Sequence, residues 1–282
     1  MTATAPQRLI TSLGNDTVKS VRALHMRKER AATGRFLAEG LKFVGEALDL
    51  GRAPRLLLVG EDARNHPLLD RARAETHAAG GEVVTVTRPI LEKISRKENA
   101  QTVLGVFDQV YTPLSAITPS SSNCWIALEQ VRDPGNLGTI IRTADAAGCG
   151  GVILIDECVD PYSIEAVRAT MGSIFAVTIS RTSSSEFLAW RQSWPGSVVG
   201  TRLDAREGYR EATLASPALV LMGNEQAGLS DALAAACDVN VKIPMRGRAD
   251  SLNLAIATGI MAYAATEAVC RSEKGVPISP TS

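Results

Sequence analysis

Apolar residues near the start of the chain recur at the spacing of a helix. In the segment TVKSVRALHMRKER, Val18, Val21, Leu24 and Met26 lie near this spacing, which predicts one helix. The following segment, FLAEGLKFVGEALDLG, predicts a second helix. Gly51 is expected to close it, because glycine readily adopts the left-handed conformation that ends helices.

The chain then alternates between short apolar runs and helical segments. The runs RLLLVG, EVVTVT and TVLGVF predict strands, and residues 67–78 and 88–95 predict the helices between them. These elements together predict a small α/β domain over residues 1–110. The uncharged stretch TPLSAITPSSSN is rich in Pro, Ser and Thr and predicts a linker over residues 111–123.

A second α/β series begins at Cys124. Its candidate strands are WIALEQV, VILID, IFAVTI, VVGTRL, ALVLMG and VNVKIPM, with helices between several of them. Near-continuous apolar strands are typical of a parallel sheet that helices cover on both faces. The second domain is therefore predicted over residues 124–271, and residues 272–282, which contain two prolines, are expected to form a loose tail.

Composition places the protein among globular cytoplasmic proteins. A chain of 282 residues, 45% of them apolar, can bury two moderate cores. It contains no uncharged apolar run of membrane-spanning length, and its N-terminus lacks the apolar region of a secretory signal, so no membrane partner is expected. The five cysteines are scattered singly without a CxxC pair or a nearby histidine, which predicts reduced thiols and no metal site.

The zero net charge hides an uneven distribution. Residues 1–112 carry 17 Lys and Arg against 13 Asp and Glu, and residues 1–42 carry eight against three. A basic N-terminal surface is one interpretation, and a solvated helix face is the other. The candidate RNA-binding residues on this surface are Arg22, Arg27, Lys28, Arg30 and Arg35.

Three unusual polar loops follow strands of the second domain. They are VRDPGNLGTIIRTADAAG, LMGNEQAGLS and IPMRGRADSLN, after the first, fifth and sixth candidate strands. In a parallel sheet, ligands bind beyond the carboxyl ends of the strands, where these loops are expected. The plain alternative for the third loop is a strand-to-helix connection in which Asp250 or Ser251 is the N-cap.

The first loop leads into a helix for which Asn136 is a good N-cap and Gly148 a good terminator. Arg142 lies off the predicted buried stripe of this helix, and Gly138 one turn earlier leaves its guanidinium room to reach the loop edge beside Asn136. An ordinary surface arginine is the alternative. The residues of the buried stripe are Leu137, Ile140, Ile141 and Ala144.

Several common catalytic motifs are absent from the sequence. Gly135 and Gly138 give only GxxG rather than the dinucleotide fingerprint GxGxxG, which disfavours a Rossmann oxidoreductase. There is also no GxxxxGK[ST] phosphate loop, no GxSxG elbow and no histidine in the second domain.

The three loops instead carry an ordered pattern, NLGxxxRxA, then GNExxGLS, then IPMxGxxxSLNxAxA. With this pattern, residues 124–270 resemble the SpoU/TrmH branch of the SPOUT superfamily, which are RNA ribose 2′-O-methyltransferases. The first domain is similar to the substrate-binding domain of the ribosomal-RNA members, through ITSLGNDTVKSVRALHMRKER and FLAEGLKFVGEAL. The resemblance implies a parallel-sheet α/β domain with a deep trefoil knot, which composition alone would not predict because knots are rare.

The same resemblance implies the activity and the partners. The expected reaction is methyl transfer from S-adenosylmethionine to a ribose 2′-OH in structured RNA, with 23S-type ribosomal RNA as the expected substrate, by a homodimer that needs no metal. A tRNA 2′-O-methyltransferase and a non-catalytic RNA-binding ribosome-assembly factor are the alternatives. The dimer is expected to use the apolar final helix LAIATGIMAYAATEAV, whose alternative role is core packing.

The motif positions imply two sets of site residues. The polar catalytic set comprises Asn136, Arg142, Glu225, Ser251 and Asn253. The set expected around the cofactor comprises Met222, Gly223, Ile243, Met245 and Leu252.

Overall fold

The computed structural model describes residues 9–273, which form two compact units. The first unit combines the residues up to Gln109 with Asp160–Phe175, and the second combines Val110–Val159 with the residues from Ala176 onward. The segment Asp160–Phe175 thus packs with the first unit, although the sequence-based division assigned it to the second domain. Residues 274–282 of the predicted loose tail lie outside the described residues.

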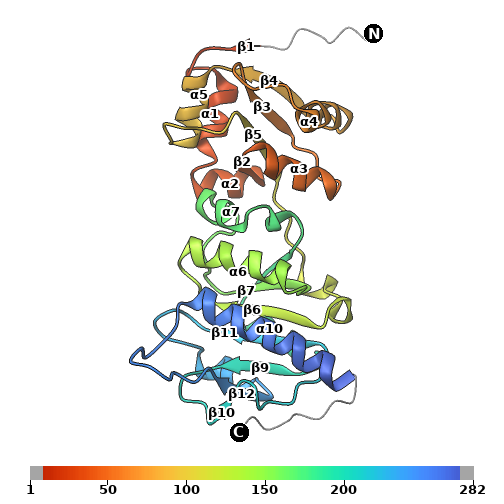
Figure 1. The fold of residues 1–282 in the computed structure, drawn as a ribbon, viewed down its shortest axis with the longest axis vertical. Helices are drawn as coiled ribbons and strands as arrows, with labels where there is room; N and C mark the ends of the chain where they lie inside the picture. The colour runs from red at the N-terminus through yellow and green to blue at the C-terminus, as the bar shows by residue number, and fades with distance from the viewer. Residues whose placement is uncertain (1–8, 274–282) are drawn as a thin grey trace. The chain divides into compact units, whose positions relative to one another are not determined.

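The first unit is built on a five-stranded mixed sheet (Figure 1). Its strand order is β1-β4-β3-β5-β2, in which β1, β4 and β3 run parallel and β5 is antiparallel to both of its neighbours. The three apolar runs predicted as strands are confirmed as β3, β4 and β5. The strands are β1 (Leu9–Ile10), β2 (Arg35–Glu39), β3 (Leu56–Gly60), β4 (Glu82–Val86) and β5 (Val103–Asp108).

Helices cover this sheet because their apolar faces meet its buried strands. α1 and α5 pack together over one face with Val18, Val21, Ile90 and Leu91 in the core, while α3 packs against α4. The predicted helices at residues 67–78 and 88–95 are confirmed as α4 and α5. The helices are α1 (Asp16–Ala23), α2 (Arg27–Thr33), α3 (Leu41–Asp49), α4 (Pro67–Ala78), α5 (Arg88–Ser95) and α7 (Ile164–Thr170).

The segment FLAEGLKFVGEALDLG does not form one helix, as predicted, but a strand followed by a helix. Phe36, Leu37 and Ala38 are fully buried in β2 and pair with β5. The chain then turns at Gly40, whose φ of 107° is accessible to glycine, and α3 follows until Gly51 closes it in the left-handed conformation. A short apolar run cannot be distinguished from a helical one by periodicity alone.

The first predicted helix is likewise divided, into α1 and α2, because a buried arginine binds the connection between them. Arg30 is only 4% exposed, and its Nη1 donates to the carbonyl oxygens of Leu24 and His25 at 2.8 and 3.0 Å. Its Nε and Nη2 bind the carboxylate of Asp160 at 2.8 and 2.6 Å. The carbonyl groups freed at the helix break are therefore satisfied by a side chain.

The segment around α7 is integrated into the core of the first unit. The ring of Phe36 lies 4.7 Å from that of Tyr162 and 5.8 Å from that of Phe175, measured between centroids. Arg168 on α7 donates to the buried carboxylate of Glu39 at 2.7 Å and to the carbonyl oxygen of Ser95 at 2.9 Å. Aromatic packing and charge-assisted hydrogen bonds thus hold this segment to the first unit.

The second unit contains a seven-stranded sheet in which every pair of neighbours is parallel, as predicted. The strand order is β10-β12-β9-β11-β6-β7-β8. One predicted strand is displaced: in IFAVTI, Ser173–Phe175 forms a 3-10 turn and the strand begins only at Thr178. The strands are β6 (Cys124–Glu129), β7 (Gly151–Ile155), β8 (Thr178–Thr182), β9 (Val198–Thr201), β10 (Glu207–Gly208), β11 (Ala218–Met222) and β12 (Val239–Lys242).

Helices cover both faces of the parallel sheet. α6 (Pro134–Ala146) and α10 (Leu254–Glu273) pack against each other, α6 on β7 and α10 on β6 and β11, as Figure 1 shows. On the other face, Phe187 of α8 (Ser184–Arg191) and Leu233 of α9 (Asp231–Ala235) join the core. The stretch 111–123, predicted as a linker, packs on this unit through Leu114 and the buried Ile117.

Two general expectations can be compared with the described residues. None of the helices within residues 9–273 has the length and apolarity needed to cross a bilayer. The thiols of Cys124, Cys149, Cys158 and Cys237 are free, as predicted, and the first three are buried.

Candidate active site

The three polar loops meet at the carboxyl edge of the parallel sheet, as predicted. Asn136 of the first loop donates through Nδ2 to Oε1 of Glu225 in the second loop at 3.3 Å. Asn253 of the third loop donates through Nδ2 to Oδ1 of Asn136 at 2.9 Å. Three members of the predicted polar set are thereby joined in one hydrogen-bonded chain, although they lie up to 117 residues apart.

The backbone of Asn136 is held at the start of α6. α6 begins at Pro134, and Asp133 is its N-cap, accepting from the backbone N–H of Asn136 at 2.6 Å. The prediction that Asn136 is the N-cap was wrong, because the pair Asp133–Pro134 occupies the N-cap and first helical positions, which these residue types favour. Asp133 was missed, although this dipeptide is a readable signal in the sequence.

Arg142 is an exposed cation on the same helix. The predicted stripe of Leu137, Ile140, Ile141 and Ala144 is confirmed as fully buried, and Arg142 lies outside it. Its guanidinium makes no hydrogen bond or ion pair with any residue in the described part of the chain. An arginine without a partner, on the helix that also carries Asn136, is available to an anion.

The second loop is held in a tight turn by Asn224, a residue that the sequence analysis did not single out. Its Oδ1 accepts from the backbone N–H groups of Gln226 and Ala227, and its Nδ2 donates to the carbonyl oxygen of Gln130 at 2.8 Å. Gln130 itself has a φ of 50°, an uncommon conformation for a residue other than glycine. This bond ties the second loop to the end of β6.

Gly223 allows the second loop to close into a tight turn in which its backbone is in close contact with Gly228 and Leu229. A Cβ added there would lie 2.0 Å from the carbonyl carbon of Gly228 and from the backbone nitrogen of Leu229. Asn224 and Gly228 also exchange two backbone hydrogen bonds of 3.0 Å, and Gly228 has a φ of 71°. Glycine is therefore required at position 223 by the chain itself, before any ligand is considered.

The third loop ends at Asn253, which is the N-cap of α10. Its Oδ1 accepts from the backbone N–H groups of Ala255 and Ile256 at 2.9 and 3.3 Å. The alternative prediction of Asp250 or Ser251 as the N-cap was therefore wrong. Ser251 is exposed and its hydroxyl donates to Asp250 at 3.4 Å.

The predicted cofactor residues lie on or after β11 and β12, and immediately before α10. Met222 and Gly223 are buried at the end of β11, Ile243 and Met245 are half-buried after β12, and Leu252 is 36% exposed. Partly uncovered apolar side chains next to a polar hydrogen-bonded chain suit a ligand with an apolar and a polar part. An adenosine derivative has both an apolar and a polar part of this kind. Residues 9–273 contain no cluster of His, Cys, Asp and Glu side chains that could hold a metal ion.

The candidate RNA-binding residues are not all on the surface. Arg27 and Lys28 are exposed, Arg22 is half-buried, and Arg35 is exposed and lies 3.9 Å from the carboxylate of Asp108. The prediction for Arg30 was wrong, because this residue is buried with Asp160.

Two substitutions separate the two roles of Asn253. Asn253→Ala removes the N-cap and is expected to lower the free energy of unfolding by about 1 kcal/mol. Asn253→Asp retains an acceptor for the cap but removes the donor to Asn136, so it is expected to lower turnover while leaving stability close to that of the parent. Urea unfolding and methyl-transfer kinetics measure both quantities, and full activity in the Asp variant would contradict a role for the hydrogen-bonded chain.

Comparison with known proteins places the geometry in context. Residues 123–263 match the model of the SpoU rRNA Methylase family, and residues 15–105 match the MRM3-like substrate binding domain. The 23S rRNA (guanosine(2553)-2′-O)-methyltransferase RlmP of Bacillus subtilis is 31% identical over 90% of this chain and 97% of its own length. The 23S rRNA (uridine(2479)-2′-O)-methyltransferase of Streptomyces viridochromogenes is 31% identical over 85% of each chain.

A solved structure is similar to this protein over almost the whole length of both chains. The crystal structure of an AdoMet-bound rRNA methyltransferase from Sinorhizobium meliloti is 46% identical, with a TM-score of 0.87, over 93% of this chain and 98% of that chain.

Proposed function

We propose that this chain, which belongs to the SpoU rRNA methylase family, transfers a methyl group from S-adenosylmethionine to a ribose 2′-hydroxyl of ribosomal RNA. The observation that carries the proposal is the hydrogen-bonded chain of Glu225, Asn136 and Asn253, together with the unpartnered Arg142 on the helix that carries Asn136. The relatives named above act on 23S rRNA, which supports the large ribosomal RNA as the substrate class.

Arg142 is proposed to bind the phosphate next to the target ribose and to stabilise the negative charge that develops on the attacking oxygen. A guanidinium forms strong, directional hydrogen bonds with phosphate oxygens. It is a poor general base, because an arginine side chain is not deprotonated in proteins. The proton of the hydroxyl therefore passes to phosphate or water.

Asn136 is proposed to orient the ribose or Arg142. Its side chain is bound by Glu225 on one side and Asn253 on the other, yet each amide still has a free hydrogen or lone pair. Ser251 is proposed to hold the third loop and the ribose. A site whose polar groups are positioned before the substrate binds loses little free energy to reorganisation during the reaction.

The cofactor supplies the chemistry that the side chains lack. When bound, S-adenosylmethionine provides a methyl group made electrophilic by its sulfonium charge. Gly223, Ile243 and Leu252 are proposed to contact its adenosine part, with Met222 and Met245 as additional walls. Positioning the hydroxyl in line with this methyl group contributes up to about 7–11 kcal/mol of the barrier reduction.

The loops of the site are also proposed to form a deep trefoil knot, with the chain around Gly223–Gly228 and Ile243–Asn253 wrapped about the cofactor. The match of residues 123–263 to the SpoU rRNA Methylase family supports this proposal, because the resemblance to that family implied the knot. Cofactor binding would then depend on backbone groups that only the folded loops bring together.

The active form is proposed to be a cytoplasmic homodimer that uses α10. Ile256 and Tyr263 lie seven residues apart on one side of this helix, and they are 57% and 48% exposed. Sedimentation at micromolar concentration is expected to give a species of twice the 29.9 kDa chain mass, and Ile256→Glu with Tyr263→Glu to shift it to the monomer. A parent protein that sediments as a monomer would contradict the dimer.

A binding measurement separates this enzyme from a non-catalytic RNA-binding protein of the same fold. Calorimetric titration with S-adenosylmethionine and S-adenosylhomocysteine is expected to show binding below millimolar ligand. If neither ligand binds at millimolar concentration, the non-catalytic alternative is favoured.

A further inference from the structure

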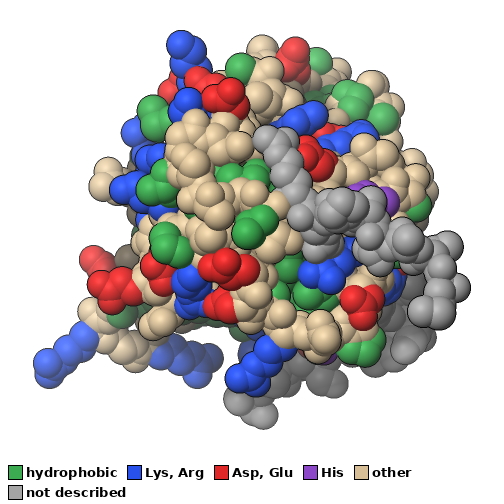
Figure 2. Space-filling model, turned by 90° about the horizontal axis from the view of Figure 1, so that it is seen from above, with side chains coloured by type: hydrophobic (Ala, Val, Ile, Leu, Met, Phe, Trp, Pro, Cys, Tyr) green, Lys and Arg blue, Asp and Glu red, His purple; other side chains and the backbone are tan. Residues whose placement is uncertain are grey.

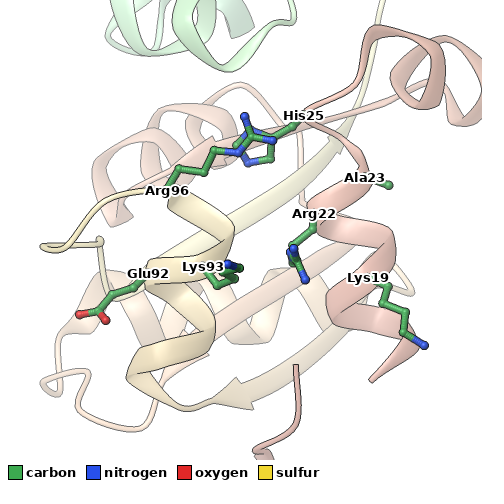
Figure 3. Close-up of a pocket in the computed structure, with 7 residues that line it drawn as sticks. All are labelled: Lys19, Arg22, Ala23, His25, Glu92, Lys93 and Arg96. Carbon is green, nitrogen blue, oxygen red and sulfur yellow. The ribbon is translucent and has the colours of Figure 1, made fainter. Parts of the chain in front are cut away.

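A hollow of about 650 Å³ lies on the first unit between α1 and α5. Figure 3 shows Arg22 of α1 and Lys93 of α5 directed into the space between the two helices. Arg96, immediately after α5, extends over the same space toward His25. The remaining lining residues are Lys19, Ala23 and Glu92.

Three of the four Lys and Arg residues that line this hollow are not neutralised by the described residues, and the fourth, Lys19, is paired with Asp16 at 3.1 Å. Arg22, Lys93 and Arg96 form no ion pair or side-chain hydrogen bond with any of residues 9–273. The one acidic residue of the lining, Glu92, is held by Arg88 at 3.2 Å and points away from the hollow (Figure 3). Like charges placed together without a counterion repel one another, so an anion in this space would be stabilised.

His25 adds a hydrogen-bonding wall rather than a further charge. Burial lowers the pKa of His25, and the nearby Arg96 lowers it further, so the ring is neutral at neutral pH. Its Nε2 lies 2.6 Å from the carbonyl oxygen of Ile94 and must donate to it, because a carbonyl oxygen can only accept. The side chain therefore ties the end of α1 to the end of α5 and fixes the width of the hollow.

Arg96 is held in an unfavourable backbone conformation. It is the C-cap of α5 with a φ of 54°, a position at which glycine is the usual residue. An arginine there carries a conformational cost that glycine would not. A strained residue whose side chain reaches into an unneutralised basic hollow points to a binding role.

We infer that the hollow between α1 and α5 binds the sugar-phosphate backbone of the RNA substrate through Arg22, Lys93 and Arg96. The inference rests on the proposed function, since it assigns part of that RNA to this surface. Apart from Ala23 and the His25 ring, every residue that lines the hollow is charged, and none is Phe, Tyr or Trp, so the lining suits phosphate groups better than bases. Contacts of this kind position the RNA without reading its sequence.

The view from above in Figure 2 shows Lys and Arg side chains at the left edge, next to uncharged side chains and to several Asp and Glu side chains. A free nucleotide or inorganic phosphate would share the charge but would occupy the hollow alone.

A structural role is the competing explanation, because cations near helix C-termini also stabilise the helix dipole. The two explanations differ in what a neutral substitution changes. Loss of a helix-end charge lowers stability, whereas loss of a phosphate contact lowers RNA affinity and its salt dependence.

The test uses the full-length protein with Arg22, Lys93 and Arg96 all replaced by Gln, and Lys42→Gln as the control, since Lys42 is exposed on α3 outside the hollow. Binding of protein-free 23S rRNA is measured across a range of salt concentrations. The log–log salt slope is expected to flatten by about 2, because each phosphate contact contributes about 0.7 for single strands. One decade below the salt concentration at which the two proteins bind equally, the triple variant is therefore expected to bind RNA about 100-fold more weakly than the parent protein.

The affinity for S-adenosylmethionine is expected to stay unchanged in the triple variant. The single variant Arg96→Gly is expected to raise the melting temperature while weakening RNA binding, a combination that a purely structural role does not produce. An unchanged affinity and salt slope in the triple variant would overturn the inference. So would inorganic phosphate that binds the parent protein but not the triple variant while both bind RNA equally.

These outcomes are separate from a failure of the proposed function. If the parent protein bound RNA but transferred no methyl group to it, the reaction assignment would fail while the hollow remained an RNA site.

Discussion

Replacement of Arg142 by alanine is expected to lower kcat by about 10³-fold while leaving the affinity for S-adenosylmethionine unchanged. A decrease in kcat of this size is expected because the substitution removes a hydrogen-bond donor that stabilises negative charge developing only in the transition state. Arg142 is exposed and has no partner among the described residues, so its removal costs the fold little. Single-turnover methyl transfer and calorimetric cofactor binding measure the two quantities.

A matched variant and a conservative one sharpen this test. Asp145→Asn changes an exposed charge on the same helix and is expected to leave turnover unchanged. Arg142→Lys keeps the positive charge but loses the planar fork that binds phosphate, so it is expected to recover only part of the rate. Turnover of the alanine variant within a few-fold of the parent would remove Arg142 from the reaction.

The Gly223→Ala substitution is expected to lower the free energy of unfolding by about 3 kcal/mol and to abolish cofactor binding. The added Cβ would lie 2.0 Å from backbone atoms of Gly228 and Leu229, which cannot move aside as a flexible side chain could. For a chain of this size the melting temperature is expected to fall by about 10 °C.

Gly247→Ala is the matched control for this prediction. Gly247 lies in the third loop, has no positive φ, and an added Cβ would meet nothing within 4 Å. It is therefore expected to leave both the melting temperature and cofactor affinity unchanged. If the Gly223→Ala protein had the melting temperature of the parent and bound the cofactor, the contact of Gly223 with Gly228 and Leu229 would not constrain the site.

The architecture of the second unit could be predicted from the sequence because local signals and tertiary structure agree there. Its strands are continuous apolar runs buried on both faces, and the stripe from Leu137 to Ala144 has a clear helical period. The ordered motif then placed Asn136, Glu225 and Asn253 on neighbouring loops, and the observed hydrogen bonds join all three.

The first unit was harder to predict because long-range contacts override its local pattern. The helix break before α2 depends on Arg30, whose carboxylate partner Asp160 lies 130 residues away. No spacing pattern in the sequence predicts such a pair, and the count of charged residues alone assigned Arg30 to the surface. For the same reason the assignment of Asp160–Phe175 to the first unit could not be read from the sequence.

The predictions of the N-cap residues were wrong for a more local reason. Several residues near each helix start were chemically able to cap, and the choice depended on which carboxylate or amide the backbone turned toward the helix. Asp133 rather than Asn136 caps α6, which frees the Asn136 side chain for Glu225 and Asn253. The residues carried over from the family motif thus kept their place in the site while their local geometry had to come from the structure.

The position of the transferred methyl group tests the central proposal most directly. The protein is incubated with methyl-labelled S-adenosylmethionine and protein-free 23S rRNA, and the digested nucleosides are identified by mass spectrometry. A single 2′-O-methylated nucleoside is expected with the parent protein, and none with the Arg142→Ala variant. Label found only on base carbons or nitrogens, or no label in RNA although the cofactor binds, would contradict the proposal.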